Sequence, residues 1–288
     1  MAYKKKVIYD FGANNGCDIP YYLMKSDVVV AVEANPILAD DLKSRFHEQV
    51  ASKKLVVENC VLTVEKGGEK RPFYIHKTST GRSQFPRPPE AELGNFDEIF
   101  LDSKNVIDII NEHGEPFYIK IDLEGYDHIV LKNLFLNKIR PTFISAESHN
   151  IEIFALLLVL GEYKSFNLVH GPTVITKYKD CVVRKEDGSS AFYSFPRDSA
   201  GPFGGDIKGP WMIPNNFFAY LAFEKLGWKD IHATNLIDPD PEFRVDFGTY
   251  LGEALRARLL FILRTYTPGA YGALRKIWRF FYKHFVGL

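Results

Sequence analysis

The chain has 288 residues, of which 46% are hydrophobic and 25% charged, a composition typical of a folded globular protein rather than a disordered one. Its 36 Lys and Arg residues equal its 36 Asp and Glu residues, so the net charge gives no reason to expect a protein that binds nucleic acid. Its three Cys residues are far apart, which fits neither a disulfide framework nor a zinc site and favours a reducing compartment.

From Val7 to Gly171, apolar β-branched runs alternate with amphipathic stretches. This alternation predicts right-handed crossovers and a mainly parallel sheet covered by helices on both faces. The predicted strands are residues 7–12, 28–33, 55–63, 73–78, 117–122, 142–148 and 166–171, with 73–78 in a hairpin arm. The predicted helices are residues 18–25, 36–49, 128–138 and 153–160.

The first predicted strand runs into the turn "GANNG", which contains Gly12 and Gly16. Gly adopts backbone dihedrals that other residues avoid, so the pair suits a tight turn beneath a ligand, although it would equally serve to shape the connection. The turn lacks the middle Gly of a dinucleotide fingerprint and the Gly-Lys-Ser/Thr of a triphosphate loop. Asp10 beside it disfavours an anion, so a ligand with a cationic centre and an adenosine, such as S-adenosylmethionine, suits the turn better.

Glu33 ends the second predicted strand. At such a position a carboxylate can accept hydrogen bonds from both hydroxyls of a ribose, and dinucleotide-binding folds place an acidic residue about 20 positions after the Gly turn for this purpose. The alternative is that Glu33 caps the helix that begins at Pro36. Its coincidence with the Gly turn favours ribose binding.

Five acidic residues lie at or just past the ends of predicted strands: Asp10, Glu33, Asp122, Glu124 and Glu147. Ligands of parallel sheets bind outside these carboxyl ends. Carboxylates gathered at one edge repel one another and lose hydration, so a fold keeps such a cluster mainly for function. Taken singly, each residue would also serve as the cap of a following helix.

Five segments resemble, in their order and spacing, the FkbM-type branch of the class I S-adenosylmethionine-dependent methyltransferases. They are "DFGANNG", "VVAVEANP", "NCVLT", "YIKIDLEGYDHIVLKNL" and "PTFISAES", and the resemblance covers about Val7 to Gly171. It implies an α/β, Rossmann-like fold with a mainly parallel seven-stranded sheet that contains one antiparallel strand. It also implies an enzyme that methylates hydroxyls of sugars or polyketide-like products.

The resemblance further implies which residues bind the cofactor. Asp10, Gly12, Asn14 and Gly16 would line the methionine end of S-adenosylmethionine, Glu33 the ribose, and Asn59 with its neighbours the adenine side. Asn15 stands where the family usually has an aliphatic residue, which is a local departure from the pattern.

Methyl transfer to a hydroxyl is an in-line displacement in which the hydroxyl proton is removed as the new bond forms. We expect Asp122 and Glu124 to shape the acceptor site and Glu147 or His149 to act as the base. His149 has the most suitable unperturbed pKa, and Glu147 would orient it or bind a substrate hydroxyl. Three carboxylates and a His would also hold a divalent cation, but no ligand spacing demands one, so we predict that no metal is required.

The alternation is lost from Pro172 onward, where Gly, Pro, Ser and aromatic residues indicate long loops. We therefore predict a cofactor-binding core in residues 1–171, loops and helices on the acceptor side in residues 172–253, and basic amphipathic helices in residues 254–288. Residues 217–226 and 246–264 are predicted to be helical. Residues 81–90 and 199–206 would form a lid over the acceptor.

Several side chains in these loops suit contacts with an acceptor. Phe203, Trp211 and Phe217 would pack on sugar faces, and Arg82 or Arg87 would bind an anionic group. Plain loop packing explains each of them equally well.

Residues 254–288 contain seven Lys and Arg residues and no Asp or Glu. Apolar residues recur near helical spacing in their second half, which is typical of an interfacial helix on an anionic membrane. Docking on the enzyme body or pairing in a dimer would explain the apolar face as well. Because we find no secretory signal and no span of about 18 apolar residues, we expect a cytoplasmic protein with peripheral contact at the inner membrane face.

The sequence therefore favours an O-methyltransferase acting on a saccharide, a glycan or a related product, in which case a lipid-linked glycan would be a suitable acceptor. A noncatalytic sugar-binding or scaffold protein that keeps the fold is the alternative, and the intact Gly12, Gly16 and Glu33 argue against it. An NAD-dependent oxidoreductase is a third hypothesis, disfavoured by the missing middle Gly.

Overall fold

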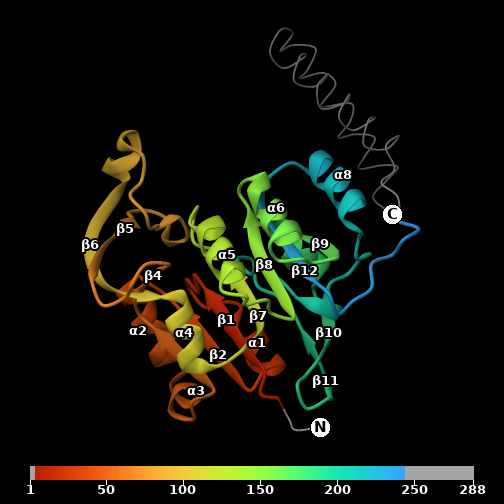
Figure 1. Ribbon diagram of the computed structural model, residues 1–288. Coiled ribbons are helices and arrows are strands. Elements are labelled where there is room, and N and C mark those ends of the chain that lie inside the picture. The colour runs from red at the N-terminus through yellow and green to blue at the C-terminus, as the bar shows by residue number, and fades with distance from the viewer. Residues whose placement is uncertain (1–3, 244–288) are drawn as a thin grey trace, which may run out of the picture. The chain divides into compact units, whose positions relative to one another are not determined.

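The computed structural model describes residues 4–243, which lie within one compact unit. Its centre is a seven-stranded sheet with the order β3-β2-β1-β7-β8-β12-β9 (Figure 1). The strands are β1 (Val7–Phe11), β2 (Val28–Val32), β3 (Leu55–Glu58), β7 (Pro116–Ile121), β8 (Phe143–Ser148), β9 (Ser165–His170) and β12 (Gly227–Thr234). β12 pairs antiparallel with both β8 and β9, and the other pairs are parallel. The predicted α/β fold, with one antiparallel strand in a parallel sheet, is confirmed.

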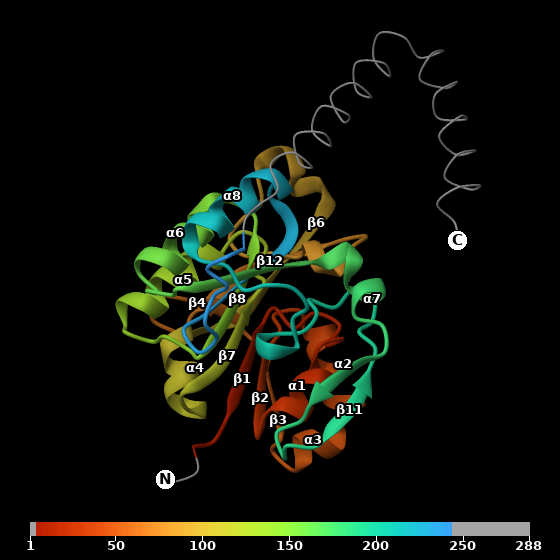
Figure 2. The same ribbon diagram turned by 90° about the vertical axis from the view of Figure 1, so that its right-hand side faces the viewer.

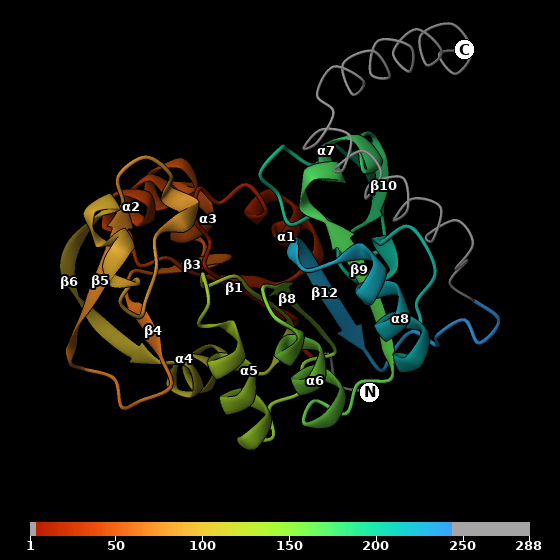
Figure 3. The same ribbon diagram turned by 90° about the horizontal axis from the view of Figure 1, so that it is seen from above.

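Helices cover both faces of this sheet, as Figure 3 shows from above. One face carries α1 (Ile19–Lys25), α2 (Pro36–Arg45), α3 (His47–Ala51) and the short α7 (Val174–Lys177). The other carries α4 (Val106–His113), α5 (Asp127–Leu136), α6 (Ile151–Val159) and α8 (Pro214–Glu224). Because both faces are covered, β1 and β2 are buried along their whole length, which explains their continuous apolar runs.

A second, three-stranded sheet stands beside the first, in the order β4-β6-β5. Its strands are β4 (Val61–Thr63), β5 (Lys70–His76) and β6 (Phe96–Asn105). β5 and β6 are antiparallel and form the long arm at one side of Figure 1, which confirms the predicted hairpin arm. Between them lie the 3-10 turns η1 (Thr80–Arg82) and η2 (Glu90–Asn95). The sequence does not predict β6, because its short apolar run 99–101 is flanked by charged residues and only two of its ten residues are buried.

Two predicted elements are each divided in the structure. The single strand expected at 55–63 is β3 and β4, which belong to different sheets, with Asn59 and Cys60 at the break. The single helix expected at 36–49 is α2 followed by α3, because Phe46 leaves helical geometry.

Residues 172–243 contribute more strand than the sequence predicts. They contain the hairpin of β10 (Cys181–Arg184) and β11 (Ser190–Tyr193), which lies beside α1 (Figure 2), and they also supply β12. The turns η3 (Gly171–Thr173) and η4 (Gly204–Asp206) complete the segment. The helix predicted at 217–226 is found as α8, whereas the helix at 246–264 and the basic helices of 254–288 lie outside the described residues. Within residues 4–243, no helix has the length and apolar character to cross a bilayer.

Candidate functional site

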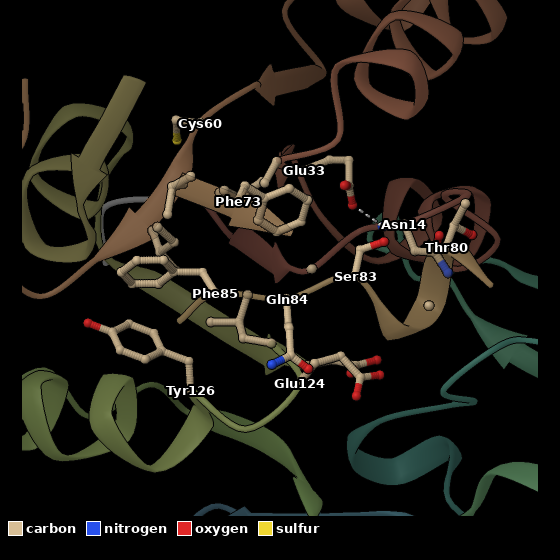
Figure 4. A pocket seen from close by; sticks show the side chains of 18 residues that line it. Asn14, Glu33, Cys60, Phe73, Thr80, Ser83, Gln84, Phe85, Glu124 and Tyr126 are labelled. Atoms are coloured by element: carbon tan, nitrogen blue, oxygen red, sulfur yellow. Dashed lines mark hydrogen bonds between the residues drawn. The ribbon is translucent and has the colours of Figure 1, made fainter. Parts of the chain in front are cut away.

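A pocket lies between the carboxyl ends of β1, β2 and β7 and the neighbouring three-stranded sheet (Figure 4). Apolar side chains occupy one side of it and polar side chains the other, as the labelled residues of Figure 4 show. Its lining consists of Gly12, Asn14, Val32, Glu33, Ala34, Cys60, Val61, Leu62, Phe73, Thr80, Gly81, Ser83, Gln84, Phe85, Asp122, Leu123, Glu124 and Tyr126. Such a pocket suits a ligand with one apolar and one polar end.

The turn after β1 requires glycine for steric reasons. Gly12 has φ +87°, and a Cβ there would lie 1.9 Å from the carbonyl oxygen of Asp122, so the turns after β1 and β7 touch at this residue. Gly16 has φ +67°, and its Cβ would lie 2.3 Å from a methyl group of Leu42 on α2. Gly12 therefore lines the pocket, whereas Gly16 packs the turn against α2 and is not part of the lining, and their expected contacts with the cofactor stay predictions.

Glu33 is held in place by backbone groups on both sides. Its Oε2 accepts a hydrogen bond from the N–H of Asn14 at 2.6 Å, and its Oε1 accepts one from the N–H of Asn35 at 2.7 Å. Burial raises the pKa of Glu33 to about 7, although these two hydrogen bonds act to lower it. Each oxygen keeps further acceptor capacity toward the pocket, which is what binding of two hydroxyls requires.

Asn59 holds the chain behind Glu33. Its side-chain amide donates to the carbonyl oxygens of Glu33 and Ala34, at 2.9 and 3.0 Å. These two hydrogen bonds fix the backbone at the point where β3 ends and the chain turns toward β4. Asn59 is absent from the pocket lining, and its expected contact with adenine stays a prediction.

A buried lysine, which the sequence did not mark as functional, joins the turns after β1 and β7. The Nζ of Lys120 lies 3.4 Å from Asp10 Oδ1 and 3.3 Å from Asp122 Oδ2. Burial raises the pKa of Asp10 to about 6, against the effect of Lys120. Burial acts to lower the pKa of Lys120, but Asp10 and Asp122 outweigh it and the pKa is raised well above its ordinary value. Asp10 therefore lies behind the pocket and is 1% exposed, with Lys120 between it and Asp122.

Asp18, at the start of α1, binds the segment predicted as one half of the lid. The hydroxyl of Ser199 donates to Asp18 Oδ1, and the N–H of Ala200 donates to Oδ2 at 3.1 Å. Both Ser199 and Asp18 are buried. Residues 199–200 are thus packed against α1, while the other predicted half, residues 81–90, contributes Gly81, Ser83, Gln84 and Phe85 to the pocket.

The four predicted catalytic residues come together at one edge of the pocket. Carboxylate oxygens of Asp122, Glu124 and Glu147 lie within 4.8 Å of one another. His149 Nε2 lies 3.0 Å from Glu147 Oε2. The turn after β7 and the end of β8 bring them together, as the parallel sheet predicts.

The charges within this group differ from the expected ones. The hydrogen bond to Glu147 raises the pKa of His149 to about 9, so its imidazole carries a proton at neutral pH. Burial, followed by the nearby Asp122 and Glu147, raises the pKa of Glu124 to about 7. A group that is already protonated cannot accept a proton, so at neutral pH Glu124 is better suited to act as a base than His149.

The oxygens of Asp122, Glu124 and Glu147 are close enough to share one divalent cation. Clustered acidic groups also occur where no cation binds. The expectation that no metal is required stays a prediction.

The three aromatic residues expected to contact a sugar are buried in the protein. Phe203 is stacked on Tyr118 with ring centroids 4.0 Å apart, and Trp211 and Phe217 are likewise buried. The prediction that they pack on an acceptor is therefore wrong. Apolar residues in an irregular segment suggest exposed side chains that can contact a ligand. The sequence does not show that η4 and α8 pack against the sheet and bury them.

The two arginines expected to bind an anionic group are exposed and paired. Arg87 lies 2.9 Å from Glu90, and Arg82 lies 3.9 Å from Glu92. Neither arginine lines the pocket.

Residues 10–164 match the family model of the methyltransferase FkbM domain, and this span contains every predicted cofactor-binding and catalytic residue. No match is found among curated proteins. Among solved structures, the chain is similar to the crystal structure of methyltransferase FkbM from Methylobacillus flagellatus KT, with 16% sequence identity and a TM-score of 0.39. That alignment covers 59% of this chain and 41% of the other, so the chain spans less than half the length of that protein.

Proposed function

The chain belongs to the FkbM methyltransferase family, and from this we propose that it transfers a methyl group from S-adenosylmethionine to a hydroxyl of a saccharide or a related small molecule. The observation that carries the proposal is the buried carboxylate of Glu33, fixed beside the glycine turn in a pocket at the carboxyl ends of the strands.

The residues of the pocket fit this cofactor from end to end. The apolar wall of Cys60, Leu62, Phe73, Phe85 and Tyr126 suits the adenine ring, and the adjoining Glu33 suits the ribose hydroxyls. At the polar end, the cofactor would lie against the bare backbone of the glycine turn.

One polar atom in the pocket supports the placement of the methionine end. The side-chain oxygen of Asn14 is buried and has no hydrogen-bond partner among residues 4–243. An unsatisfied buried acceptor is costly unless a ligand satisfies it. The ammonium group of a bound methionine moiety would donate to this oxygen, and Asp122 supplies negative charge nearby.

When bound, S-adenosylmethionine supplies a methyl group already activated by the positive sulfur. The chain has to exclude water, align the acceptor and receive the hydroxyl proton. The carboxylates of Asp122, Glu124 and Glu147 lie within 4.8 Å of one another at the edge of the pocket. An acceptor would enter at this edge, so all three would be close to its hydroxyl.

An exposed aromatic residue supports a saccharide as the acceptor. Trp228 follows Gly227, the first residue of β12. Gly227 pairs with Ser148 at the end of β8, and its carbonyl accepts a hydrogen bond from the Ser148 hydroxyl at 3.0 Å. The indole of Trp228 packs on Gly171, where a Cβ would come within 2.3 Å of the ring, yet the residue is 46% exposed. A half-exposed indole on the strand that pairs with the end of β8 is suited to stacking on the apolar face of a sugar.

The basic residues 254–288 suggest where the acceptor would be found. We propose that this tail attaches the enzyme to an anionic membrane that carries a lipid-linked glycan, on the basis of its seven cations and no acids. The full chain is expected to sediment with phosphatidylserine vesicles and not with phosphatidylcholine vesicles. Equal recovery with both would contradict the proposal.

The cofactor part of the proposal is tested by calorimetry with S-adenosylmethionine and S-adenosylhomocysteine. We expect both to bind, and Glu33→Ala to weaken both by about ten- to a hundredfold, the value of one or two hydrogen bonds to a charged group. Glu112→Ala, an exposed glutamate on α4, is the matched control. A folded wild-type protein that binds neither compound would overturn the assignment.

The acceptor part is tested with S-adenosylmethionine carrying a tritiated methyl group. We expect label to appear in neutral methyl glycosides or oligosaccharides incubated with the full chain. Transfer only to acceptors that lack a sugar hydroxyl would contradict the saccharide assignment while leaving the methyltransferase assignment intact.

A further inference from the structure

The turn after β7 holds Glu124 in an unusual backbone conformation. Glu124 has φ +48°, followed by Gly125 at φ +95°. A non-glycine residue in this left-handed region costs free energy and persists only where its surroundings enforce it. A glutamate therefore occupies a backbone conformation that asparagine or glycine adopts at a lower cost in free energy.

Asp127 enforces this conformation. Its Oδ1 accepts a hydrogen bond from the N–H of Leu123 at 3.4 Å, and its Oδ2 accepts one from the N–H of Gly125 at 3.2 Å. The two donors flank Glu124 on either side, and Asp127 is only 1% exposed. The buried carboxylate therefore fixes the backbone that presents Glu124 to the pocket.

The charged neighbours of Glu124 are mostly engaged with other partners. Asp122 pairs with Lys120 on β7, and Glu147 at the end of β8 pairs with His149. No residue within 4–243 donates a hydrogen bond to the Glu124 carboxylate, which lies among the oxygens of Asp122 and Glu147. Burial and these two carboxylates disfavour its charged form, while His149 favours it, and its pKa is raised to about 7. Glu124 can therefore exchange a proton near neutral pH.

We propose that Glu124 is the general base of the methyl transfer, that Asp127 positions it, and that its ionisation is coupled to the positive charge of the cofactor. This rests on the proposed function. Glu124 is ionised while the cationic cofactor is bound, and it takes up a proton as that charge disappears.

The step balances in atoms and charge. The acceptor O–H bond breaks and its proton passes to Glu124, the acceptor oxygen bonds to the methyl carbon, and the carbon–sulfur bond breaks with its electron pair kept by sulfur. The products are a methyl ether, neutral S-adenosylhomocysteine and protonated Glu124, which then loses its proton to solvent. One positive and one negative charge vanish together, so no net charge is left buried in the pocket.

The coupling has a consequence for binding that needs no acceptor. S-adenosylmethionine carries one positive charge more than S-adenosylhomocysteine, so ionised Glu124 favours the former. Glu33 ionises in the same pH range, but both compounds carry the ribose that it faces. The ionisation of Glu33 changes both dissociation constants by the same factor, so it does not change their ratio. The ratio therefore depends only on the charges near the sulfur.

The experiment is calorimetric titration of both compounds from pH 5.5 to 8.5. In the wild type, we expect the preference for S-adenosylmethionine to rise about tenfold as pH passes through 7, the effect of a one-unit pKa shift on binding. A ratio that does not change with pH would overturn the proposal, whereas failure of both compounds to bind would instead overturn the proposed function.

Two matched variants assign the effect to this residue. Glu124→Asp keeps the charge, Glu124→Asn removes it, and both side chains tolerate positive φ, so folding is preserved. The Asp variant is expected to retain the pH-dependent ratio and the Asn variant to lose it. Retention of the rise in Glu124→Asn would assign the coupling to another group, such as Asp127, whose pKa is also raised to about 7 by burial, and would contradict the proposal.

Discussion

The carboxylate of Glu33 accepts a hydrogen bond of 2.6 Å from the backbone N–H of Asn14. This contact ties the end of β2 to the glycine turn after β1, the two segments that we assign to the cofactor. The carboxylate that we propose binds the ribose is therefore also part of the framework that shapes the pocket.

Because the pKa of Glu33 is raised to about 7, the affinity for the cofactor is expected to depend on pH. Below pH 7, protonation places a hydrogen on one oxygen, which then no longer accepts bonds from both the backbone and the ribose. Binding of S-adenosylhomocysteine is expected to weaken several-fold between pH 8 and pH 6 in calorimetry. Glu33→Gln should bind more weakly at pH 8 and lose this pH dependence, and a variant that keeps it would contradict the role of Glu33.

Replacing Gly12 by Ala is expected to damage both folding and binding. The new Cβ would lie 1.9 Å from a backbone carbonyl oxygen, at φ +87°, and the backbone strain alone costs about 1–3 kcal/mol. Thermal unfolding is expected at a markedly lower temperature, with binding of S-adenosylhomocysteine lost. Gly94→Ala, where a Cβ meets nothing within 4 Å, is the control and should behave like the wild type.

Asp127→Asn is expected to disturb Glu124 rather than the fold as a whole. Asparagine keeps one acceptor oxygen, so one of the two bonds to the turn is lost. It also removes a negative charge near Glu124, which lowers the pKa of Glu124. The pH at which the preference for S-adenosylmethionine rises should therefore shift downward. An unchanged midpoint with a lowered melting temperature would indicate a structural role only.

The ligand-free protein is expected to lose stability as pH rises from 6.5 to 8.5. Buried carboxyl groups have raised pKa values, about 6 for Asp10 and about 7 for Glu33, Glu124 and Asp127. In this range the folded state holds protons that the unfolded state has already lost, so deprotonation favours unfolding. His149, with its pKa raised to about 9, acts in the same direction.

Urea unfolding at pH 6.5 and pH 8.5 measures this effect. His232 acts in the opposite direction, because burial lowers its pKa to about 3. It destabilises the folded state only where the unfolded imidazole is protonated, below a pH of about 6.5, so it has little effect between pH 6.5 and pH 8.5. Saturating S-adenosylmethionine should reduce the loss at pH 8.5, because the bound cation stabilises ionised carboxylates. Greater stability at pH 8.5 than at pH 6.5 without ligand would contradict these pKa directions.

Trp228→Ala is expected to weaken acceptor binding without affecting the cofactor. For a saccharide found by the methyl-transfer assay, the KM should rise about two- to tenfold, as for loss of a stacked aromatic contact of about 0.5–1.5 kcal/mol. Trp228→Phe should recover part of the loss. Phe192→Ala, on the exposed face of the β10–β11 hairpin, is the control, and an equal effect of both alanine variants would contradict the assignment.

Particular residues show what could be predicted from the sequence. The runs "VIYDF" and "VVVAV" predicted β1 and β2, and the acids after the strands predicted an edge where Asp122, Glu124, Glu147 and His149 meet. β12 was not predicted, because "GWKDIHAT" places polar residues where a buried strand normally has apolar ones. Asp230 and His232 are nonetheless buried in it.

The sequence by itself determined most of the strands and helices up to β9, the glycine turn and the family, because these depend on local periodicity and on residues close together in the chain. Only the tertiary structure decided which aromatic residues are buried, that Lys120 joins Asp10 to Asp122, and that His149 is charged while Glu124 titrates near neutrality. Burial and pKa depend on the distance to groups far away in the sequence, and that distance exists only once the chain has folded.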